Sequence, residues 1–286
     1  MNRLKKRKTE EKLFKIIMII CSGIIITALS TIIISIVYKG LPSLSWQMIT
    51  ETPKGGYYFG KEGGILNAIV GSLYLAIGAT ILALIVALPV ALYMNVHLIN
   101  KQKLVHSIRF FMDVLWGIPS IVYGAFAFTI MIYIGAKTSL LAGIITVALF
   151  ITPIMIRAID EVLKTVPRGL LEATLSLGST KSEVSIIVYV RQCLPGIITG
   201  VLLSFGRAIG DAASVLFTTG FTDNIPTSLS QPTATLPLSI FFQLASPIPE
   251  VKNRAYASAV ILTVIILIIS MASRWFSKKY AKSITK

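Results

Sequence analysis

The 286-residue sequence is 55% hydrophobic and only 14% charged, and its mean hydropathy is +0.80. Soluble domains carry about 25% charged residues, so this composition excludes a soluble cytosolic domain. The net charge of +15 raises the question of nucleic acid. Lys and Arg lie between and beside long apolar runs, however, and form no continuous basic face, so we expect no nucleic-acid partner.

The apolar runs predict six membrane spans, because a span needs about 20 mostly apolar residues. In chain order they are Ile16–Val37, Ala68–Met94, Val114–Ala136, Ser139–Ile156, Leu194–Thr218 and Ala255–Ser273. The first run is too long for the apolar part of a signal peptide, so we expect it to be retained. Pro89, Pro119 and Pro153 lie inside spans and predict kinked helices. The expected fold is therefore an all-α membrane protein.

Positive charge predicts the orientation of these spans. If the N-terminus is cytoplasmic, 20 of the 27 Lys and Arg residues fall in inside segments and six in outside segments, and Arg207 remains within a span. We therefore expect both termini in the cytoplasm. The predicted layout is a basic tail (1–15), a first span (16–37), an external loop (38–65), a unit of five spans (66–275) and a cytoplasmic tail (276–286).

The long inside loop, about 157–191, predicts two short helices joined by a tight turn. Pro167 suits the first turn of a helix, and Gly178 suits its end. Ser179 or Thr180 then suits the N-cap of a second helix. Such a hairpin could receive a push from a partner protein, and the alternative is an ordinary amphipathic connector.

The fifth predicted span carries a polar stripe. Ser204, Arg207, Asp211, Ser214 and Thr218 recur in steps of three and four, and Arg207 is close to the middle of the span. A lone Arg there costs about 2.5–3.5 kcal/mol on insertion scales, so it needs a partner, a water-filled cavity or a ligand. One interpretation is a route for a phosphate-like anion, since guanidinium matches phosphate oxygens. The other is a permanent intrahelical Arg207–Asp211 ion pair.

The remaining polar residues predict little chemistry. The outside stretch Leu236–Ala245 is apolar but too short to span, so we expect it at the membrane surface or dipping in. Asp160, Glu161 and Glu183 are expected on a solvated face beside the inside loop. The two cysteines have no metal-ligand spacing, and the spans lack a His/carboxylate cluster. We expect no catalytic residue, no metal and no cofactor.

Four motifs resemble the permease subunits of ABC importers, and of phosphate-specific (PstA-type) ones in particular, from about Gly63 to the end. The inside loop contains Glu172-Ala173-Thr174-x-x-x-Gly178, which is similar to the E-A-A-x-x-x-G loop of these permeases, although Arg191 stands where the general consensus has proline. The other three motifs are Gly117–Gly124, Arg207–Ala213 with Leu216–Thr218, and Thr235–Phe241.

The resemblance implies a type I ABC importer (MetI-like) permease fold in a bacterial cytoplasmic membrane. It implies that Glu172, Ala173, Thr174 and Gly178 couple to a dimeric ATP-binding subunit. The other implied partners are a second homologous permease subunit (PstC-type), an extracytoplasmic phosphate-binding protein and membrane lipid. Arg207 and Arg157 match family arginines of the transport route. The polar stripe of the fifth span adds Asp211, Ser204 and Ser214 to the route residues that we expect. By physics alone, Arg157 is an interfacial anchor.

The sequence contains no G-x-x-x-x-G-K-[ST] phosphate loop, so ATP hydrolysis must come from a separate protein. The predicted function is a permease subunit of an ATP-driven phosphate importer that works by alternating access. Three alternatives stay open: the same machine with another solute such as molybdate or sulfate, a self-sufficient secondary transporter or channel, and a membrane enzyme.

Overall fold

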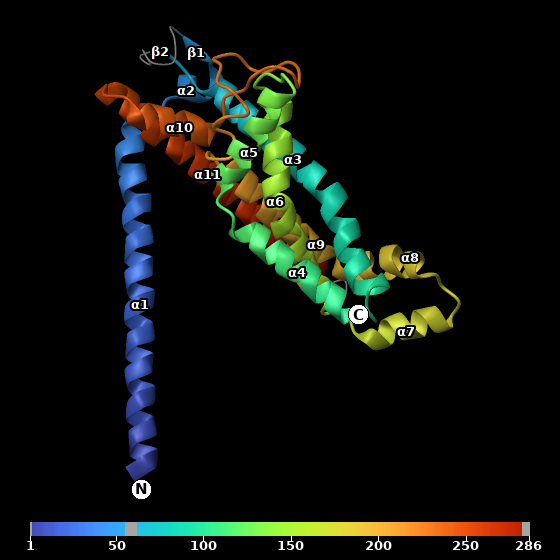
Figure 1. The fold of residues 1–286 in the computed structure, drawn as a ribbon. Helices are drawn as coiled ribbons and strands as arrows, with labels where there is room; N and C mark the ends of the chain where they lie inside the picture. The colour runs from blue at the N-terminus through green and yellow to red at the C-terminus, as the bar shows by residue number, and fades with distance from the viewer. Residues whose placement is uncertain (1, 55–61, 282–286) are drawn as a thin grey trace.

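The computed structural model describes residues 2–54 and 62–281, and nearly all of its regular structure is helical (Figure 1). An N-terminal part contains α1 (Asn2–Gly40), the 3-10 turn η1 (Leu41–Ser43), α2 (Trp46–Thr50) and the antiparallel pair β1 (Pro53–Lys54) and β2 (Glu62–Gly63). The remaining elements are α3 (Leu66–Leu92), the π-helical η2 (Tyr93–His97), α4 (Gln102–Gly117), α5 (Ser120–Tyr133), α6 (Leu140–Leu163), α7 (Arg168–Ser176), α8 (Lys181–Glu183), the π-helical η3 (Val184–Val190), α9 (Arg191–Ile209), α10 (Leu236–Ala245) and α11 (Pro249–Ala281).

Within the described residues, five helical stretches are long and apolar enough to cross a membrane. They are Glu10–Ser43, Leu66–His97, Leu140–Leu163, Lys181–Ile209 and Pro249–Phe276. They match five of the six predicted spans. Lys181–Ile209, which corresponds to the predicted span Leu194–Thr218, begins and ends earlier in the chain than predicted. A sixth span exists only if α4 and α5 are counted together, because the two helices meet at a bend of 91°.

The prediction of one helix over Val114–Ala136 is therefore wrong. The chain leaves the helical conformation at Ile118, whose ψ is 129°, and Pro119 precedes α5. Proline has no N–H to donate, and its ring disfavours the helical conformation in the residue before it. The predicted kink at Pro119 is a full break.

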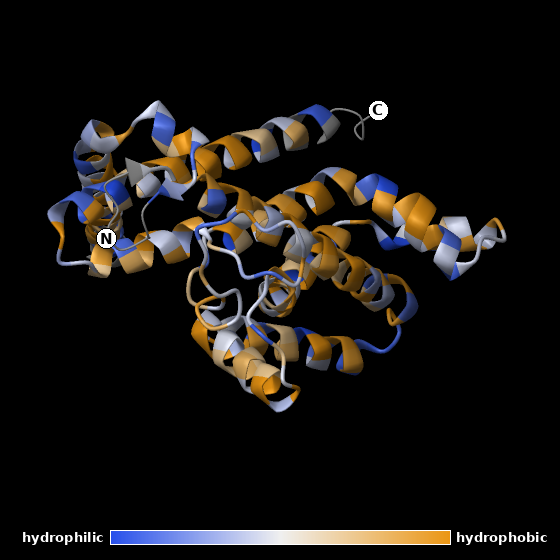
Figure 2. Cartoon of the chain, turned by 90° about the horizontal axis from the view of Figure 1, so that it is seen from above, coloured by the Kyte–Doolittle hydropathy of each residue, from blue (hydrophilic) through white to orange (hydrophobic). Residues whose placement is uncertain are grey.

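The core of the molecule lies between α3 and α6. On α3, Ala76, Ala79, Ala83 and Ala87 are fully buried at helical spacing, which lets a neighbouring helix approach closely. Large side chains of α6, such as Ile151 and Met155, belong to the same core, which α9 joins through Ile197 and Ile209. Figure 2 shows the apolar residues along the helices and the polar ones concentrated in loops and at helix ends.

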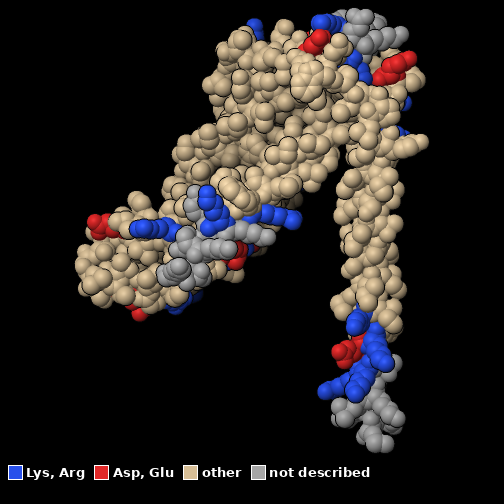
Figure 3. Space-filling model, turned by 180° about the vertical axis from the view of Figure 1, so that it is seen from behind, with Lys and Arg blue, Asp and Glu red and all other residues tan. Residues whose placement is uncertain are grey.

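The first helix stands apart from this bundle. It approaches the other helices at its C-terminal end, where Gly40 lies against Tyr256 and Val260 of α11, and the middle of α1 is exposed (Figure 1). Charged side chains gather at the N-terminal part of α1, around the strands and over the α7–α8 end, with uncharged surface between (Figure 3). This banding is what a membrane protein requires, since charge is costly in hydrocarbon.

Candidate functional site

Arg207 lies in the last turn of α9, which ends at Ile209. Its guanidinium carbon is 5.1 Å from the centroid of the Phe150 ring, a cation–π contact. Phe150 is the eleventh residue of α6, which begins at Leu140 and has 24 residues. The guanidinium therefore lies beside the middle of α6, at the C-terminal end of a helix, where a cation also complements the helix dipole.

The predicted fifth span is helical only in its first part. After Ile209 the chain runs through turns from Gly210 to Gly220, so the expected stripe through Asp211, Ser214 and Thr218 on one helix is wrong. Glycine is a poor helix former. The Asp211 carboxylate accepts a hydrogen bond from the Ser214 N–H at 2.8 Å, which offers the backbone an alternative to the helix.

This non-helical segment is held by the protein around it. The Thr218 carbonyl accepts from the Ser139 N–H, and the Thr219 carbonyl accepts from the Thr233 N–H, each at 3.0 Å. Irregular backbone at membrane depth is tolerated only where it is buried in protein or lines a water-filled cavity. Helices that end within the membrane are also a recurrent feature of transporter substrate sites.

The predicted route residues differ in accessibility. Arg207 is exposed and Asp211 is half-buried, whereas Ser204 and Ser214 are fully buried. The Ser204 hydroxyl donates to the Gly200 carbonyl at 2.9 Å within α9. Among the described residues, Arg207 forms no ion pair with Asp211, so the intrahelical pair is not observed. Only Arg207 and Asp211 of these four can meet a solute in this arrangement.

The predicted inside hairpin is present, and its turn is confirmed. Pro167 is the N-cap of α7, and Gly178 follows α7 with φ at +88°, a value that favours glycine. Thr180 caps α8 in a capping box, in which its N–H donates to the Glu183 carboxylate at 2.7 Å. Figure 1 shows α7 and α8 projecting from the bundle.

The tip of this hairpin is open to a partner. Glu172 and Ala173 are exposed, Thr174 is half-buried, and the Leu177 side chain is 86% exposed beside exposed Gly178. Leu171, by contrast, is buried on the other side of α7.

A charged cluster at the end of α6 was not predicted. Asp160, expected on a solvated face, is fully buried and accepts two hydrogen bonds from Arg109, each at 2.9 Å. Arg157 donates to Asp160 at 2.9 Å and to Asp113 at 2.7 Å, so it is more than an interfacial anchor. The sequence signal was the spacing of Arg157, Asp160 and Lys164 on one helical face.

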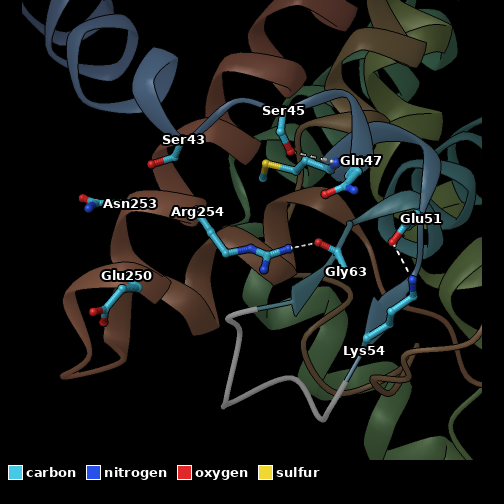
Figure 4. A pocket seen from close by; sticks show the side chains of 10 residues that line it. Ser43, Ser45, Gln47, Glu51, Lys54, Gly63, Glu250, Asn253 and Arg254 are labelled. Carbon is cyan, nitrogen blue, oxygen red and sulfur yellow. Dashed lines mark hydrogen bonds and ion pairs between the residues drawn. The ribbon is translucent and has the colours of Figure 1, made fainter.

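A second missed feature is a polar pocket near the strands, with a cavity volume of about 530 Å³ (Figure 4). Its lining includes two acids, Glu51 and Glu250, and two bases, Lys54 and Arg254. Lys54 pairs with Glu51 at 2.8 Å, and Arg254 donates to the Gly63 carbonyl. Because its charges balance, this pocket lacks the positive excess that an anion site needs.

Comparison with known proteins decides the family. The profile of the family described as "Binding-protein-dependent transport system inner membrane component" matches residues 79–285. The chain belongs to this family. It is 35% identical to the phosphate transport system permease protein PstA of Yersinia pestis, over 87% of this chain and 83% of that one. It is 31% identical to the PstA protein of Haemophilus influenzae, over 94% of both chains.

Solved structures agree on the fold. An inward-facing structure of the MetNI methionine ABC transporter matches with a TM-score of 0.60 and 17% identity, covering 75% of this chain and 95% of that one. The predicted MetI-like fold is thus confirmed. This permease is a multi-pass inner-membrane component of a binding-protein-dependent ABC transporter, a transport subunit and not an enzyme. Its family implies an ATPase and a binding protein as partners.

Proposed function

We propose that this permease forms half of the translocation route of an ATP-driven importer of inorganic phosphate. The single observation that carries the proposal is the exposed Arg207 guanidinium at the end of α9, beside the middle of α6. An arginine there is costly in hydrocarbon and suited to an oxyanion. The relatives at 31–35% identity are named phosphate transport permeases, which supports phosphate as the cargo.

The other half of the route is a second, homologous permease subunit of the PstC type. Gly206 precedes Arg207 in α9, and a Cβ added at Gly206 would meet no atom within 4 Å. That open surface leaves room for a second subunit to approach closely. Asp211 lies four residues after Arg207 and limits how tightly an anion binds. The buried Ser204 and Ser214 support the wall of the route from inside this chain.

The hairpin around Glu172, Ala173, Thr174 and Gly178 docks onto the ATPase. Nucleotide-driven closure of the ATPase moves α7, and the spans rock so that the site at Arg207 changes the side it faces. The N- and C-terminal tails (1–15 and 276–286) lie in the cytoplasm, and the five-span unit (66–275) follows an added first span. The distribution of Lys and Arg supports this orientation.

The proposal is tested by uptake into proteoliposomes that contain the whole importer, with binding protein on one side and ATP on the other. Labelled phosphate should accumulate only with ATP, and unlabelled phosphate should compete better than sulfate or molybdate. Accumulation of sulfate or molybdate in preference to phosphate would show that one of these anions is the cargo. Accumulation by this chain without any ATPase would contradict the ATP-driven mechanism.

A further inference from the structure

Apolar packing alone does not fix α4 against the bundle. Val105 is its one fully buried residue, and Ile108 and Met112 are only partly buried against the core. The side chains of Phe111 and Trp116 are 61% and 54% exposed. Little of this 16-residue helix packs against the rest of the chain, so polar contacts contribute much of its attachment.

Charged contacts supply that attachment, and they cross between α4 and α6 in both directions. Arg109 of α4 donates from Nε and Nη2 to the Asp160 carboxylate of α6, both at 2.9 Å. Arg157 of α6 donates from Nε to Asp113 of α4 at 2.7 Å. Paired, fork-shaped hydrogen bonds from arginine fix orientation as well as distance.

Asp160 is the centre of this arrangement, because it contacts residues from three elements. Besides Arg109 and Arg157, it accepts from Asn95 of η2 at 2.8 Å and lies 3.3 Å from the Lys164 ammonium. Its side chain has no exposed area. A buried carboxylate with this many donors is held in one position, and it holds its partners in turn.

The other end of α4 meets α5 at a sharp bend, which we take as its hinge. The 91° bend at residues 117–119 separates α4 from α5, and a Cβ at Gly117 would meet no atom within 4 Å. Beyond the hinge, α5 lies against the non-helical segment after α9, where a Cβ at Gly124 would come within 2.6 Å of the Ser214 carbonyl. The C-terminal end of α6, near Asp160, leads through residues 164–167 directly into α7.

We propose that Asp160 is a positioning residue that clamps α4 to α6, so that movement of the α7 hairpin passes through α4 and α5 to the segment beside Arg207. This inference rests on the proposed docking of that hairpin onto the ATPase. Without the clamp, α6 and α7 still follow the ATPase, but α4 turns freely at its hinge. ATP hydrolysis then continues while transport fails.

The test is the number of phosphate ions imported per ATP hydrolysed by the complete importer in proteoliposomes. Asp160→Asn removes the central charge and leaves Arg109 without its carboxylate partner, so it could prevent folding. The deciding variant is the double change Arg109→Gln and Asp113→Asn, because it removes both ion pairs between α4 and α6 while Asp160 keeps Arg157, Lys164 and Asn95 as partners. Glu161→Gln is the matched control, since within the described residues Glu161 pairs with Arg157 of α6 and with Lys164 just after it, and with no residue of α4.

We expect the double variant Arg109→Gln and Asp113→Asn to assemble with the ATPase, to keep hydrolysis within about twofold, and to lower the import-to-hydrolysis ratio about tenfold. Glu161→Gln should keep the ratio of the unmodified importer. An unchanged ratio in the double variant, or equal loss of hydrolysis and import, would overturn the clamp. An unmodified importer that hydrolyses ATP but takes up no phosphate would instead overturn the proposed cargo.

Discussion

At the scale of single residues, the account depends on Arg207. Replacing it with Gln removes the charge and the paired donors, and charge-assisted hydrogen bonds contribute about 1.5–3 kcal/mol. Phosphate uptake by the whole importer should therefore fall about tenfold or more. Arg207→Lys should be intermediate, because it keeps the charge without the planar fork. Arg274→Gln, which changes an exposed arginine near the end of α11, should leave uptake unchanged. Uptake that is equal in all three variants would contradict the role of Arg207.

A second residue, Gly124, tests the packing around the non-helical segment. Its Cβ position lies 2.6 Å from the Ser214 carbonyl, so a valine must push the two segments apart. Gly124→Val should lower stability by about 1–3 kcal/mol, the usual cost of overpacking. The measurement is the thermal midpoint of the purified permease in detergent. Gly23→Ala is the control, since a Cβ there meets no atom within 4 Å, and it should not lower that midpoint. A stable Gly124→Val protein would show that the contact is not close.

Helix ends and caps can be predicted from the sequence, because they depend on a few neighbouring residues. The sequence predicts Gly178 as a helix end and either Ser179 or Thr180 as the next helix cap; the structure confirms Gly178 and selects Thr180. Asp160 was misassigned because its partners Arg109 and Asn95 are 51 and 65 residues away. Spacing along one helix cannot show which distant side chains converge on it.

At the scale of elements, α9 and the α4–α5 pair depart from the prediction. Hydropathy continues past Ile209, so the apolar run predicted a helix to Thr218, but Gly210 and the Asp211–Ser214 turn end it. Hydropathy measures what can lie in a membrane, and it does not say whether the backbone there is helical. By contrast, the apolar stretch Leu236–Ala245, for which no helix was predicted, forms the helix α10 with the same bounds.

The hairpin of α7 and α8 gives an element-scale prediction. Gly178 has φ at +88°. A β-branched residue is strained there, by about 1–2 kcal/mol, whereas Asn tolerates the left-handed conformation. Gly178→Val should weaken retention of the ATPase when the complex is purified in mild detergent, and Gly178→Asn should retain more of it. Equal retention in both variants would contradict a role of this turn in docking.

At the scale of the whole molecule, the distribution of charge supports the proposed orientation. Lys and Arg concentrate in the segments predicted to be inside, and in Figure 1 the N-terminus and the α7–α8 hairpin lie toward the end away from the strands. Reporter fusions test this directly. Green fluorescent protein should fluoresce at either terminus, and alkaline phosphatase should be active only when inserted near Thr227, in the loop before α10. Phosphatase activity at either terminus would reverse the topology.

The central claim is that Arg207 lines a cavity that opens to each side of the membrane in turn. It is tested most directly by placing a cysteine there, as Arg207→Cys in a chain with Cys21→Ala and Cys193→Ala. A membrane-impermeant thiol reagent is applied from one side or the other to the assembled importer. The account predicts labelling from the cytoplasmic side without nucleotide and from the outer side when the ATPase is trapped with ATP. A cysteine that stays unreactive from both sides in both states would contradict it.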